Sequence, residues 1–425
     1  VRIKDADRRR HVYIIGQTGT GKSTLMENMA IQDIERGSGV CVIDPHGDLV
    51  EKMLSHVPEE RSDDVILFDP SDVERPLALN MLEFSTPEQK TFVVNEMINI
   101  FDKLYDLKTT GGPMFEQYMR NTMLLMMEDP ESGSTLLEVP RVLADEKFRK
   151  FKLSKTRNPV VRDFWEKEAQ KAGGDASLAN MVPYITSKLN QFIANDIMRP
   201  IISQQVSSFN FRTVMDDKKI LLINLSKGRI GDMNSTLLGM ICVGKLLMAA
   251  LSRVDTDESE RTDFYLYIDE FQNYVSESIS IILSEARKYK LNLTIAHQYI
   301  NQLTKNNNTS VRDAVFGNVG TMVAFRVGVE DAELITQQFA PVVDQYDVMN
   351  IEKYHAYIRL LIDNQNPPAF SLAPTSPQAT NPARVKALKE LSRLKYGRPR
   401  DIVESEIFER TRITPVADPP LPPIQ

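Results

Sequence analysis

Cysteine is nearly absent from this chain: among 425 residues there are two, Cys41 and Cys242. Both lie in apolar runs, so we interpret them as small core residues, and their spacing fits neither a disulfide framework nor a metal site. This usage is typical of a reducing, cytosolic environment. An excess of positive charge is missing too, because the formal net charge is −7. The chain as a whole therefore lacks the charge of a nucleic-acid-binding protein, and any contact with a polyanion must be local.

Long hydrophobic runs are also missing. The longest one, TLLGMICVGKLLMAAL (Thr236 to Leu251), contains Lys245 and is shorter than the roughly 20 residues that span a bilayer. We predict a buried helix there. The sequence shows no signal peptide. Residue 1 is a valine, however, and strand-like sequence begins by residue 12, so a membrane anchor ahead of residue 1 is left open.

The most informative feature that is present is a glycine-rich motif, GQTGTGKST, at residues 16–24. It has the spacing G-x-x-x-x-G-K-[ST] and stands between VYII, typical of a buried strand, and a helical pattern that ends at Gly37. Glycines let such a loop curl so that its N–H groups and the helix N-terminus face phosphates. We expect the lysine to reach the β- and γ-phosphates of ATP and the serine to bind Mg²⁺. The predicted nucleotide-binding residues are Gly16, Gln17, Thr18, Gly19, Thr20, Gly21, Lys22, Ser23 and Thr24.

A second motif, FYLYIDEFQNY at residues 264–274, places acidic groups at the end of a hydrophobic strand. We expect Asp269 to bind Mg²⁺ together with Ser23, and Glu270 to polarise a water molecule for attack on the γ-phosphate. A kinase or a GTPase does not need this second carboxylate as a base. The pair therefore predicts a Mg²⁺-dependent ATPase, with Lys22 contributing to catalysis, and the lack of an LSGGQ-like segment argues against a transporter cassette.

The segment SEARKYKLNLTIAHQ, residues 284–298, carries two further candidates. Gln298 stands at the tip of the strand that we predict beside the acidic one, where its amide can sense the γ-phosphate or the attacking water. Arg287 stands at the end of a helix that cannot easily fold back onto the glycine-rich loop of its own chain. It suits an arginine finger offered to a neighbouring subunit, and equally a surface arginine favoured by the helix dipole. Position alone does not decide between these two.

Strand and helix signals alternate in two separate parts of the chain. Buried-strand patterns occur at VYII, GVCVID and DVILFD, and again at KILLINL, FYLYID, LNLTIAH and TMVAFRV, whereas helical periodicity dominates from about residue 87 to 208. We predict an α/β fold: a RecA-like P-loop nucleotide domain with a mostly parallel sheet, interrupted by an all-α insertion domain. The predicted boundaries are 1–84 and 211–373 for the nucleotide domain, 85–210 for the insertion, and 374–425 for a linker, a basic helix and a Pro-rich tail.

Four segments together resemble the TraG/TraD-type coupling ATPases of conjugative type IV secretion, within the HerA/FtsK superfamily of hexameric DNA motors. They are DPHGDL, YIDEFQNY, ARKYKLNLTIAHQYINQL and GNVGTMVAFRVG, and the similarity extends from His11 to about Ala373. The resemblance implies an ATP-hydrolysing motor that translocates DNA or DNA–protein substrates into a type IV secretion channel. It implies a hexameric ring of this chain and DNA that is single-stranded and bound without sequence preference. The all-α insertion would face a relaxase or another secretion substrate, and the whole would dock on the type IV secretion apparatus.

The resemblance also assigns roles to single residues. Lys22 and Ser23 would hold phosphates and metal, Asp269 and Glu270 would be the metal-side and base carboxylates, Gln298 the polar sensor and Arg287 the trans-acting arginine. Arg326 is a second basic candidate, and a salt bridge at a subunit contact is its alternative role. We interpret Asp44 and Asp48, in DPHGDL, mainly as turn and helix-cap residues, with Asp48 placed to cap the following helix.

Coupling proteins of this type have N-terminal transmembrane helices, and residues 1–425 show no such pattern at their start. We therefore expect the cytoplasmic face of the bacterial inner membrane if an anchor precedes residue 1, and the cytoplasm otherwise. Two alternative functions stay open. One is a secretion-system ATPase of the same superfamily that does not translocate DNA, and the other is a nucleotide-gated platform that recruits substrates.

Local basic runs are the candidates for DNA contact. KFRKFKLSKTR at residues 147–157 has six basic residues and no acid, and RVKALKELSRLKYGRPR at residues 384–400 has seven against one glutamate. Either run would neutralise phosphates without sequence preference, or would form an ordinary solvated face. KGRIGDMNST at residues 227–236 follows a strand and is a candidate for a loop lining a hexamer pore.

Overall fold

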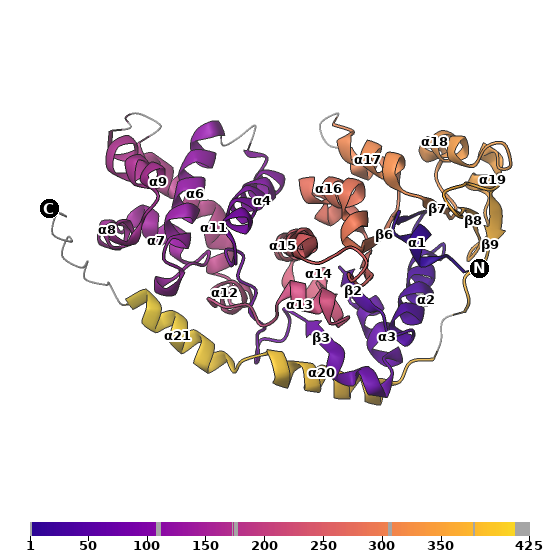
Figure 1. The fold of residues 1–425 in the computed structure, drawn as a ribbon, viewed down its shortest axis with the longest axis horizontal. Helices are drawn as coiled ribbons and strands as arrows, with labels where there is room; N and C mark the ends of the chain where they lie inside the picture. The colour runs from indigo at the N-terminus through magenta and orange to yellow at the C-terminus, as the bar shows by residue number, and fades with distance from the viewer. Residues whose placement is uncertain are drawn as a thin grey trace. The chain divides into compact units, whose positions relative to one another are not determined.

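The structure, a computed structural model, describes residues 2–107, 112–171, 173, 177–304, 308–376 and 379–412 (Figure 1). Its contacts divide the chain into two compact units. Unit 1 comprises Val1–Asp69 and Asn210–Lys395, and unit 2 comprises Pro70–Phe209 and Tyr396–Gln425. The Pro-rich tail predicted at the end of the chain lies outside the described residues.

Unit 1 is built on a nine-stranded sheet with the strand order β3-β4-β2-β5-β6-β1-β7-β8-β9. All neighbours from β3 to β7 in that order are parallel, and β8 and β9 extend one edge as antiparallel strands. This confirms the predicted α/β fold with a mostly parallel sheet. The parallel strands are buried on both faces, which explains their continuous apolar sequences. The strands are β1 (Val12–Ile15), β2 (Gly39–Asp44), β3 (Val65–Phe68), β4 (Ile220–Asn224), β5 (Phe264–Ile268), β6 (Leu291–His297), β7 (Thr321–Ala324), β8 (Ala356–Arg359) and β9 (Phe370–Leu372).

Helices cover both faces of this sheet, and Figure 1 shows α15 and α16 on the opposite side of the strands from α2 and α3. Met26 of α2, Val50 of α3 and Leu388 of α20 share one hydrophobic core with Ile14 of β1. The helices of unit 1 are α1 (Asp5–Arg8), α2 (Lys22–Glu35), α3 (Asp48–His56), α13 (Phe211–Asp216), α14 (Lys227–Ile230), α15 (Asp232–Leu251), α16 (Glu277–Glu285), α17 (Ser310–Asn318), α18 (Val329–Phe339), α19 (Gln345–Met349) and α20 (Pro382–Tyr396).

The long apolar helix α15 is a core element of unit 1, as the sequence predicts. It is longer than its apolar run: with the turn that follows, Asp232–Asp255 is long and apolar enough to cross a membrane, and among the described residues this is the one such helix. The expectation that this segment is too short to span a bilayer was therefore wrong. However, 78% of its most apolar window is buried inside the protein, and a Cβ placed on Gly239 would lie 2.2 Å from the ring of Tyr274. A helix packed this closely belongs to the core.

Helix α3 is capped by a different aspartate from the one expected. Asp48 is its first residue and lies too late to cap it, and the N-cap position is held by Gly47 in a left-handed conformation (φ 94°). The carboxylate of Asp44, at the end of β2, accepts hydrogen bonds instead from the N–H groups of Leu49 (2.8 Å) and Val50 (3.2 Å). Asp44 thus satisfies the free donors of the first helical turn, and its expected role as a cap residue is confirmed.

Unit 2 is all-helical over its described residues. Its helices are α4 (Pro87–Tyr105), α6 (Gly112–Met127), α7 (Glu138–Ala144), α8 (Glu146–Lys155), α9 (Pro159–Asp163), α10 (Ala169–Lys171), α11 (Leu178–Ile193), α12 (Met198–Ile202) and α21 (Arg400–Arg412). By its contacts the unit begins at Pro70, and the buried Asn80 side chain belongs to it, since it donates to the carbonyls of Ser134 (3.1 Å) and Gln205 (2.7 Å). The C-terminal helix α21 joins it through Arg410, whose Nε lies 2.8 Å from Glu138 Oε1. The last part of the chain is therefore two helices, α20 on unit 1 and α21 on unit 2.

Part of the basic run 147–157 is internal, contrary to a simple solvated face. Lys152 on α8 is fully buried, and its ammonium donates to the carbonyls of Met126 (3.4 Å), Asp129 (2.8 Å) and Gly133 (2.7 Å). Burial lowers the pKa of Lys152 to about 8, so the group is still mostly charged at neutral pH. It satisfies free carbonyls at the end of α6 and in the turn that follows.

Replacing Lys152 with methionine is expected to destabilise unit 2 by about 3 kcal/mol or more, because it leaves these carbonyls buried without a donor. Urea unfolding followed by circular dichroism would measure the change. Lys150→Met is the matched control on the same helix, since the ammonium of Lys150 is exposed in an ion pair with Glu146 (2.7 Å), and it should cost about 0.5 kcal/mol or less. Equal effects of the two substitutions would contradict a structural role of the buried ammonium.

Candidate nucleotide-binding site

The glycine-rich loop joins β1 to α2 at the carboxyl edge of the parallel strands, and α2 begins at Lys22 with Gly21 as its N-cap. Gly21 has φ 127°, a conformation that residues with a side chain rarely adopt. Both Gly16 and Gly21 lie against Phe325, where an added Cβ would come within 2.5 and 2.9 Å of its side chain, respectively. The two glycines therefore permit the close approach that the loop needs.

The first residues of α2 lie beside the acidic end of β5. The ammonium of Lys22 donates to the carbonyl of Gly16 (2.6 Å), and the hydroxyl of Ser23 donates to Asp269 Oδ2 (3.2 Å). Burial lowers the pKa of Lys22, while the nearby carboxylates of Glu270 and Asp269 act in the opposite direction. The residues that we predicted to bind the phosphates and the metal ion therefore lie close together.

Asp269 is the most perturbed carboxyl group of this site. Its side chain is 6% exposed, and burial, followed by the negative charges of Glu270 and Asp44, raises its pKa to about 6. Among the described residues, no group of three or more His, Cys, Asp or Glu side chains is arranged to hold a metal ion. The hydroxyl of Ser23 and the carboxylate of Asp269 nevertheless fit Mg²⁺, which uses one or two protein oxygens and takes its other ligands from phosphates and water.

Glu270 lies directly after Asp269, in a left-handed backbone conformation (φ 47°, ψ 47°). Its Oε1 accepts a hydrogen bond from Gln298 Nε2 (2.8 Å) and its Oε2 accepts one from Gln272 Nε2 (2.7 Å). Strand β6 pairs with β5 on one side and with β1 on the other. The prediction that Gln298 leaves the strand beside the acidic one is therefore confirmed, and the structure brings Gln298 and Glu270 into contact.

Sequence reasoning missed a buried group of polar side chains beneath Gln298. Gln302 Oε1 lies within hydrogen-bonding distance of the main-chain N–H of Gln298 (3.2 Å) and of His297 Nδ1 (3.3 Å), and Tyr13 Oη lies 2.6 Å from His297 Nε2. Burial lowers the pKa of His297 to about 3, so the ring is neutral. Because the Gln302 oxygen can only accept, His297 carries its proton on Nδ1 and accepts from Tyr13. No motif marks these residues, since they meet only where β1 and β6 pair.

The two candidate arginines lie at opposite ends of the parallel strands: Arg287 at their amino ends and Arg326 at their carboxyl ends. Arg287 is in the turn η7 (Ala286–Tyr289), just before β6 begins, whereas the glycine-rich loop lies at the carboxyl edge. The seven residues of β6 separate these edges by roughly 20 Å. The Arg287 side chain is exposed, with no ion pair to any described residue. Arg326 is also exposed, but it follows β7 beside the loop, and its carbonyl accepts from the N–H of Gln17 (2.8 Å).

The second basic run, residues 384–400, is largely neutralised by acids of the same chain. Lys389 pairs with Glu51, Lys395 with Asp63, Arg398 with Glu406 and Arg400 with Glu404. For these residues the pairs favour the ordinary solvated face over DNA contact, because a count of charges along the sequence does not include the partners that folding brings near. In the third candidate, 227–236, Lys227 pairs with Asp232 (3.4 Å).

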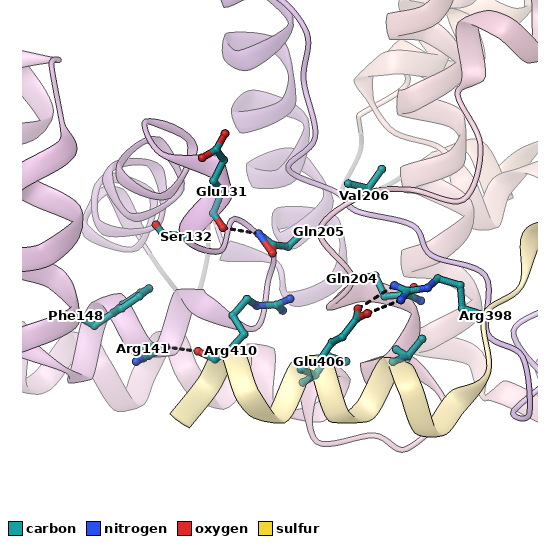
Figure 2. A pocket seen from close by; sticks show the side chains of 12 residues that line it. Glu131, Ser132, Arg141, Phe148, Gln204, Gln205, Val206, Arg398, Glu406 and Arg410 are labelled. Carbon is teal, nitrogen blue, oxygen red and sulfur yellow. Dashed lines mark hydrogen bonds and ion pairs between the residues drawn. The ribbon is translucent and has the colours of Figure 1, made fainter. Parts of the chain in front are cut away.

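Unit 2 contains a separate cavity of about 530 Å³ alongside α21 (Figure 2). Among its charged side chains, Arg398 pairs with Glu406 and Arg410 pairs with Glu138. None of the predicted site residues lines it. The lining residues are Glu131, Ser132, Arg141, Phe148, Gln204, Gln205, Val206, Arg398, Val403, Glu406, Ile407 and Arg410.

The fold and the glycine-rich loop define a P-loop protein with a RecA-like α/β unit. The model of one family, the type IV secretion-system coupling protein DNA-binding domain, matches residues 1–357. The chain belongs to this family of coupling proteins.

Solved structures with the same fold include two of the coupling protein TrwB. The bacterial conjugative coupling protein TrwBdeltaN70, in its unbound monoclinic form, is 16% identical over 89% of each chain, with a TM-score of 0.65. The plasmid coupling protein TrwB in complex with ADP and Mg²⁺ is 16% identical over 89% of this chain and 88% of the other, with a TM-score of 0.60. VirB4 of Thermoanaerobacter pseudethanolicus is 14% identical over 88% of this chain and 93% of the other, with a TM-score of 0.60. No curated protein matched by sequence.

Proposed function

We propose that this chain is the ATP-hydrolysing motor of a conjugative coupling apparatus, which moves DNA or a DNA–protein conjugate into a type IV secretion channel. The observation that carries the proposal is the meeting of Lys22, Ser23, Asp269, Glu270 and Gln298 at one edge of the sheet, in a chain of the coupling-protein family. A site for nucleotide binding alone would not need a carboxylate held beside the metal-side aspartate. This pair favours hydrolysis over a nucleotide-gated platform.

Each side chain has a defined task in this proposal. The loop N–H groups and the ammonium of Lys22 bind the phosphates, and Ser23 and Asp269 hold Mg²⁺. The bound metal supplies charge neutralisation at the phosphates. Glu270 accepts the proton of the attacking water, and Gln298, which contacts Glu270, relays whether the site is filled. TrwB has been solved with the non-hydrolysable ATP analogue ADPNP and with ADP and Mg²⁺, which supports ATP and Mg²⁺ as the ligands of this chain.

The proposal includes a hexameric ring, single-stranded DNA bound without sequence preference, and a relaxase or other secretion substrate held by unit 2. The exposed Arg287, remote from its own loop, supports a ring in which each subunit completes its neighbour's site. The ion pairs of the run 384–400 favour a solvated face for it over a DNA-binding one. We assign DNA contact to segments that the ring brings to its pore, with residues 227–236, which follow β4, as the first candidate.

The test is ATP turnover, measured as phosphate release at low salt, with and without single- and double-stranded DNA and at increasing protein concentration. We expect turnover that rises with DNA and grows faster than linearly with protein, because the site is completed by a neighbour. Lys22→Ala should be inactive under all conditions. Turnover that DNA leaves unchanged at every protein concentration would overturn the motor and would favour a secretion ATPase that does not translocate DNA.

The raised pKa of Asp269 predicts that Mg²⁺-dependent nucleotide binding weakens in acid. The carboxyl group binds the metal only when ionised, so with a pKa of about 6 the affinity for ADP with Mg²⁺ should fall about tenfold between pH 7.5 and pH 5. Fluorescence titration with a labelled ADP would measure this affinity. The Asp269→Asn variant is the control, because any pH dependence that it keeps comes from the nucleotide. A wild-type pH profile parallel to that of Asp269→Asn would contradict the role of this group.

The effect on folding has the opposite sign. The pKa of Asp269 is raised above the value of about 3.9 in an unfolded chain, so its ionisation disfavours the folded state. Its contribution to stability is full below about pH 4 and is lost as the pH rises through about 6.

A further inference from the structure

The carboxylate of Glu270 is held from two sides by side-chain amides, one on each oxygen. An ionised carboxylate only accepts hydrogen bonds, so each glutamine must turn its NH₂ group toward it. For Gln272 this has a cost: its carbonyl oxygen is buried and has no hydrogen-bond partner among the described residues. A buried acceptor left unpaired is destabilising, because it has lost its hydrogen bond to water. The contact with Glu270 is therefore what fixes the orientation of this side chain.

The backbone around Glu270 is held as firmly as its carboxylate. A left-handed conformation is unfavourable for a residue with a Cβ, and persists where surrounding contacts impose it. In this turn the N–H of Glu270 donates to Asp269 Oδ1 (3.0 Å) and its carbonyl accepts from Asn273 Nδ2 (2.9 Å). The side chain of Glu270 thus starts from a fixed point and can vary mainly through its own torsions.

Gln272 stands on a rigid support. It lies in the 3-10 turn η6 (Phe271–Tyr274), whose terminal residues Phe271 and Tyr274 are completely buried. The ring of Phe271 packs edge-on against His297, with centroids 5.1 Å apart, and that of Tyr274 packs against α15 at Gly239. With both ends of the turn anchored in the core, the amide of Gln272 can serve as a fixed reference for the carboxylate.

Gln298 holds the other oxygen from a different place. It follows β6, which lies between the acidic strand β5 and the loop strand β1. A nucleotide that draws the Gln298 amide toward its phosphates would remove the hydrogen bond to Oε1 alone. The hydrogen bond from Gln272 to Oε2, on the anchored turn, would remain.

Resting on the ATP hydrolysis proposed above, we propose that Gln272 is a positioning residue for that reaction. It holds Glu270 Oε2 so that Oε1 points to the attacking water. In the step itself one O–H bond of water breaks and its proton goes to Glu270 Oε1, while the water oxygen bonds to the γ-phosphorus. The bond from the γ-phosphorus to the β–γ bridging oxygen breaks, and its electron pair leaves with ADP.

The test is Gln272→Leu, which keeps the shape of the side chain, removes the amide and also removes the unpaired carbonyl, so the fold should not be weakened. Loss of a positioning contact is expected to lower kcat about 10- to 100-fold, with KM for ATP and the affinity for a labelled ATP analogue unchanged. Gln272→Glu places a like charge against Glu270 and should lower kcat at least as much. The matched control is Gln117→Leu, which removes an amide bound to a carboxylate, Glu168 Oε2 (3.1 Å), in unit 2, and should leave kcat unchanged.

A second readout separates positioning from a general structural effect. In a Glu270→Gln background, adding Gln272→Leu should lower the remaining single-turnover rate no further, because the two residues act as one unit. An unchanged kcat in Gln272→Leu, or a fall of kcat accompanied by a lower Tm and weaker analogue binding, would overturn the assignment while ATP hydrolysis stands. A wild-type protein that releases no phosphate from ATP would instead overturn the proposed function itself.

Discussion

Replacing Glu270 with glutamine is expected to reduce the kcat for ATP hydrolysis by about 10²- to 10⁴-fold, the usual contribution of a positioned general base. The substitution keeps the size of the side chain and removes its ability to accept a proton from water. Lys22, Ser23 and Asp269, which contact one another or the loop, are untouched. Phosphate release should therefore nearly stop, while the affinity for a labelled ATP analogue stays close to that of the wild type.

Glu285→Gln is the matched control for this prediction. Glu285 is an exposed glutamate at the end of α16, 3.9 Å from Lys288, and its neutralisation should leave kcat unchanged. A Glu270→Gln protein that keeps more than about a tenth of the wild-type kcat would place the base elsewhere. Loss of analogue binding in the same protein would show that the carboxylate supports the nucleotide rather than the reaction.

Arg287→Ala is expected to lower turnover by about 10³- to 10⁵-fold, the range of arginine fingers, although the residue lies far from the loop of its own chain. The seven residues of β6 separate Arg287 from that edge of the sheet, so its effect requires a neighbouring subunit. Mixing Arg287→Ala with Lys22→Ala should partly restore activity. In a mixed ring, the Lys22→Ala subunit offers its intact arginine to the intact loop of the other.

Two further variants make this result specific. Lys288→Ala removes an adjacent exposed charge and should leave turnover near the wild-type level. Arg326→Ala tests the competing arginine, which lies beside the loop of its own chain through the contact of its carbonyl with Gln17. A mixture that forms rings but stays inactive, or an Arg287→Ala protein with normal turnover, would rule out Arg287 as the finger. Activity that depends on Arg326 and is not restored by mixing would assign the role to that residue within one subunit.

The glycine-rich loop and the acidic strand end were predictable because each is a local pattern. The loop needs glycine at positions 16 and 21, where Phe325 leaves no room for a Cβ, and the strands on both sides are continuous apolar runs. The same reasoning found each parallel strand of the sheet. It missed the antiparallel strands β8 and β9, which are short and, in part, exposed, so their sequences show neither a long apolar run nor a clear alternation.

Charge patterns were less predictable than strands. Lys152 belongs to a run of basic residues, yet it is buried and donates to main-chain carbonyls. The run 384–400 is paired with Glu51, Asp63, Glu404 and Glu406, of which the first two are more than 300 residues away. A count of charges along the chain cannot include such partners, because the fold brings them next to the Lys and Arg side chains only after the helices have packed.

The sequence by itself determined the fold class, the phosphate-binding loop and the identity of the acidic pair, because these depend on residues that are neighbours in the chain. The tertiary structure alone decided which side chains of the site are in contact. The pairing of β6 between β1 and β5 brings Gln298 onto Glu270, and the packing of Phe271 against His297 fixes the turn that carries Gln272. Both contacts depend on strand order, and strand order follows from how apolar faces pack together, which no local pattern records.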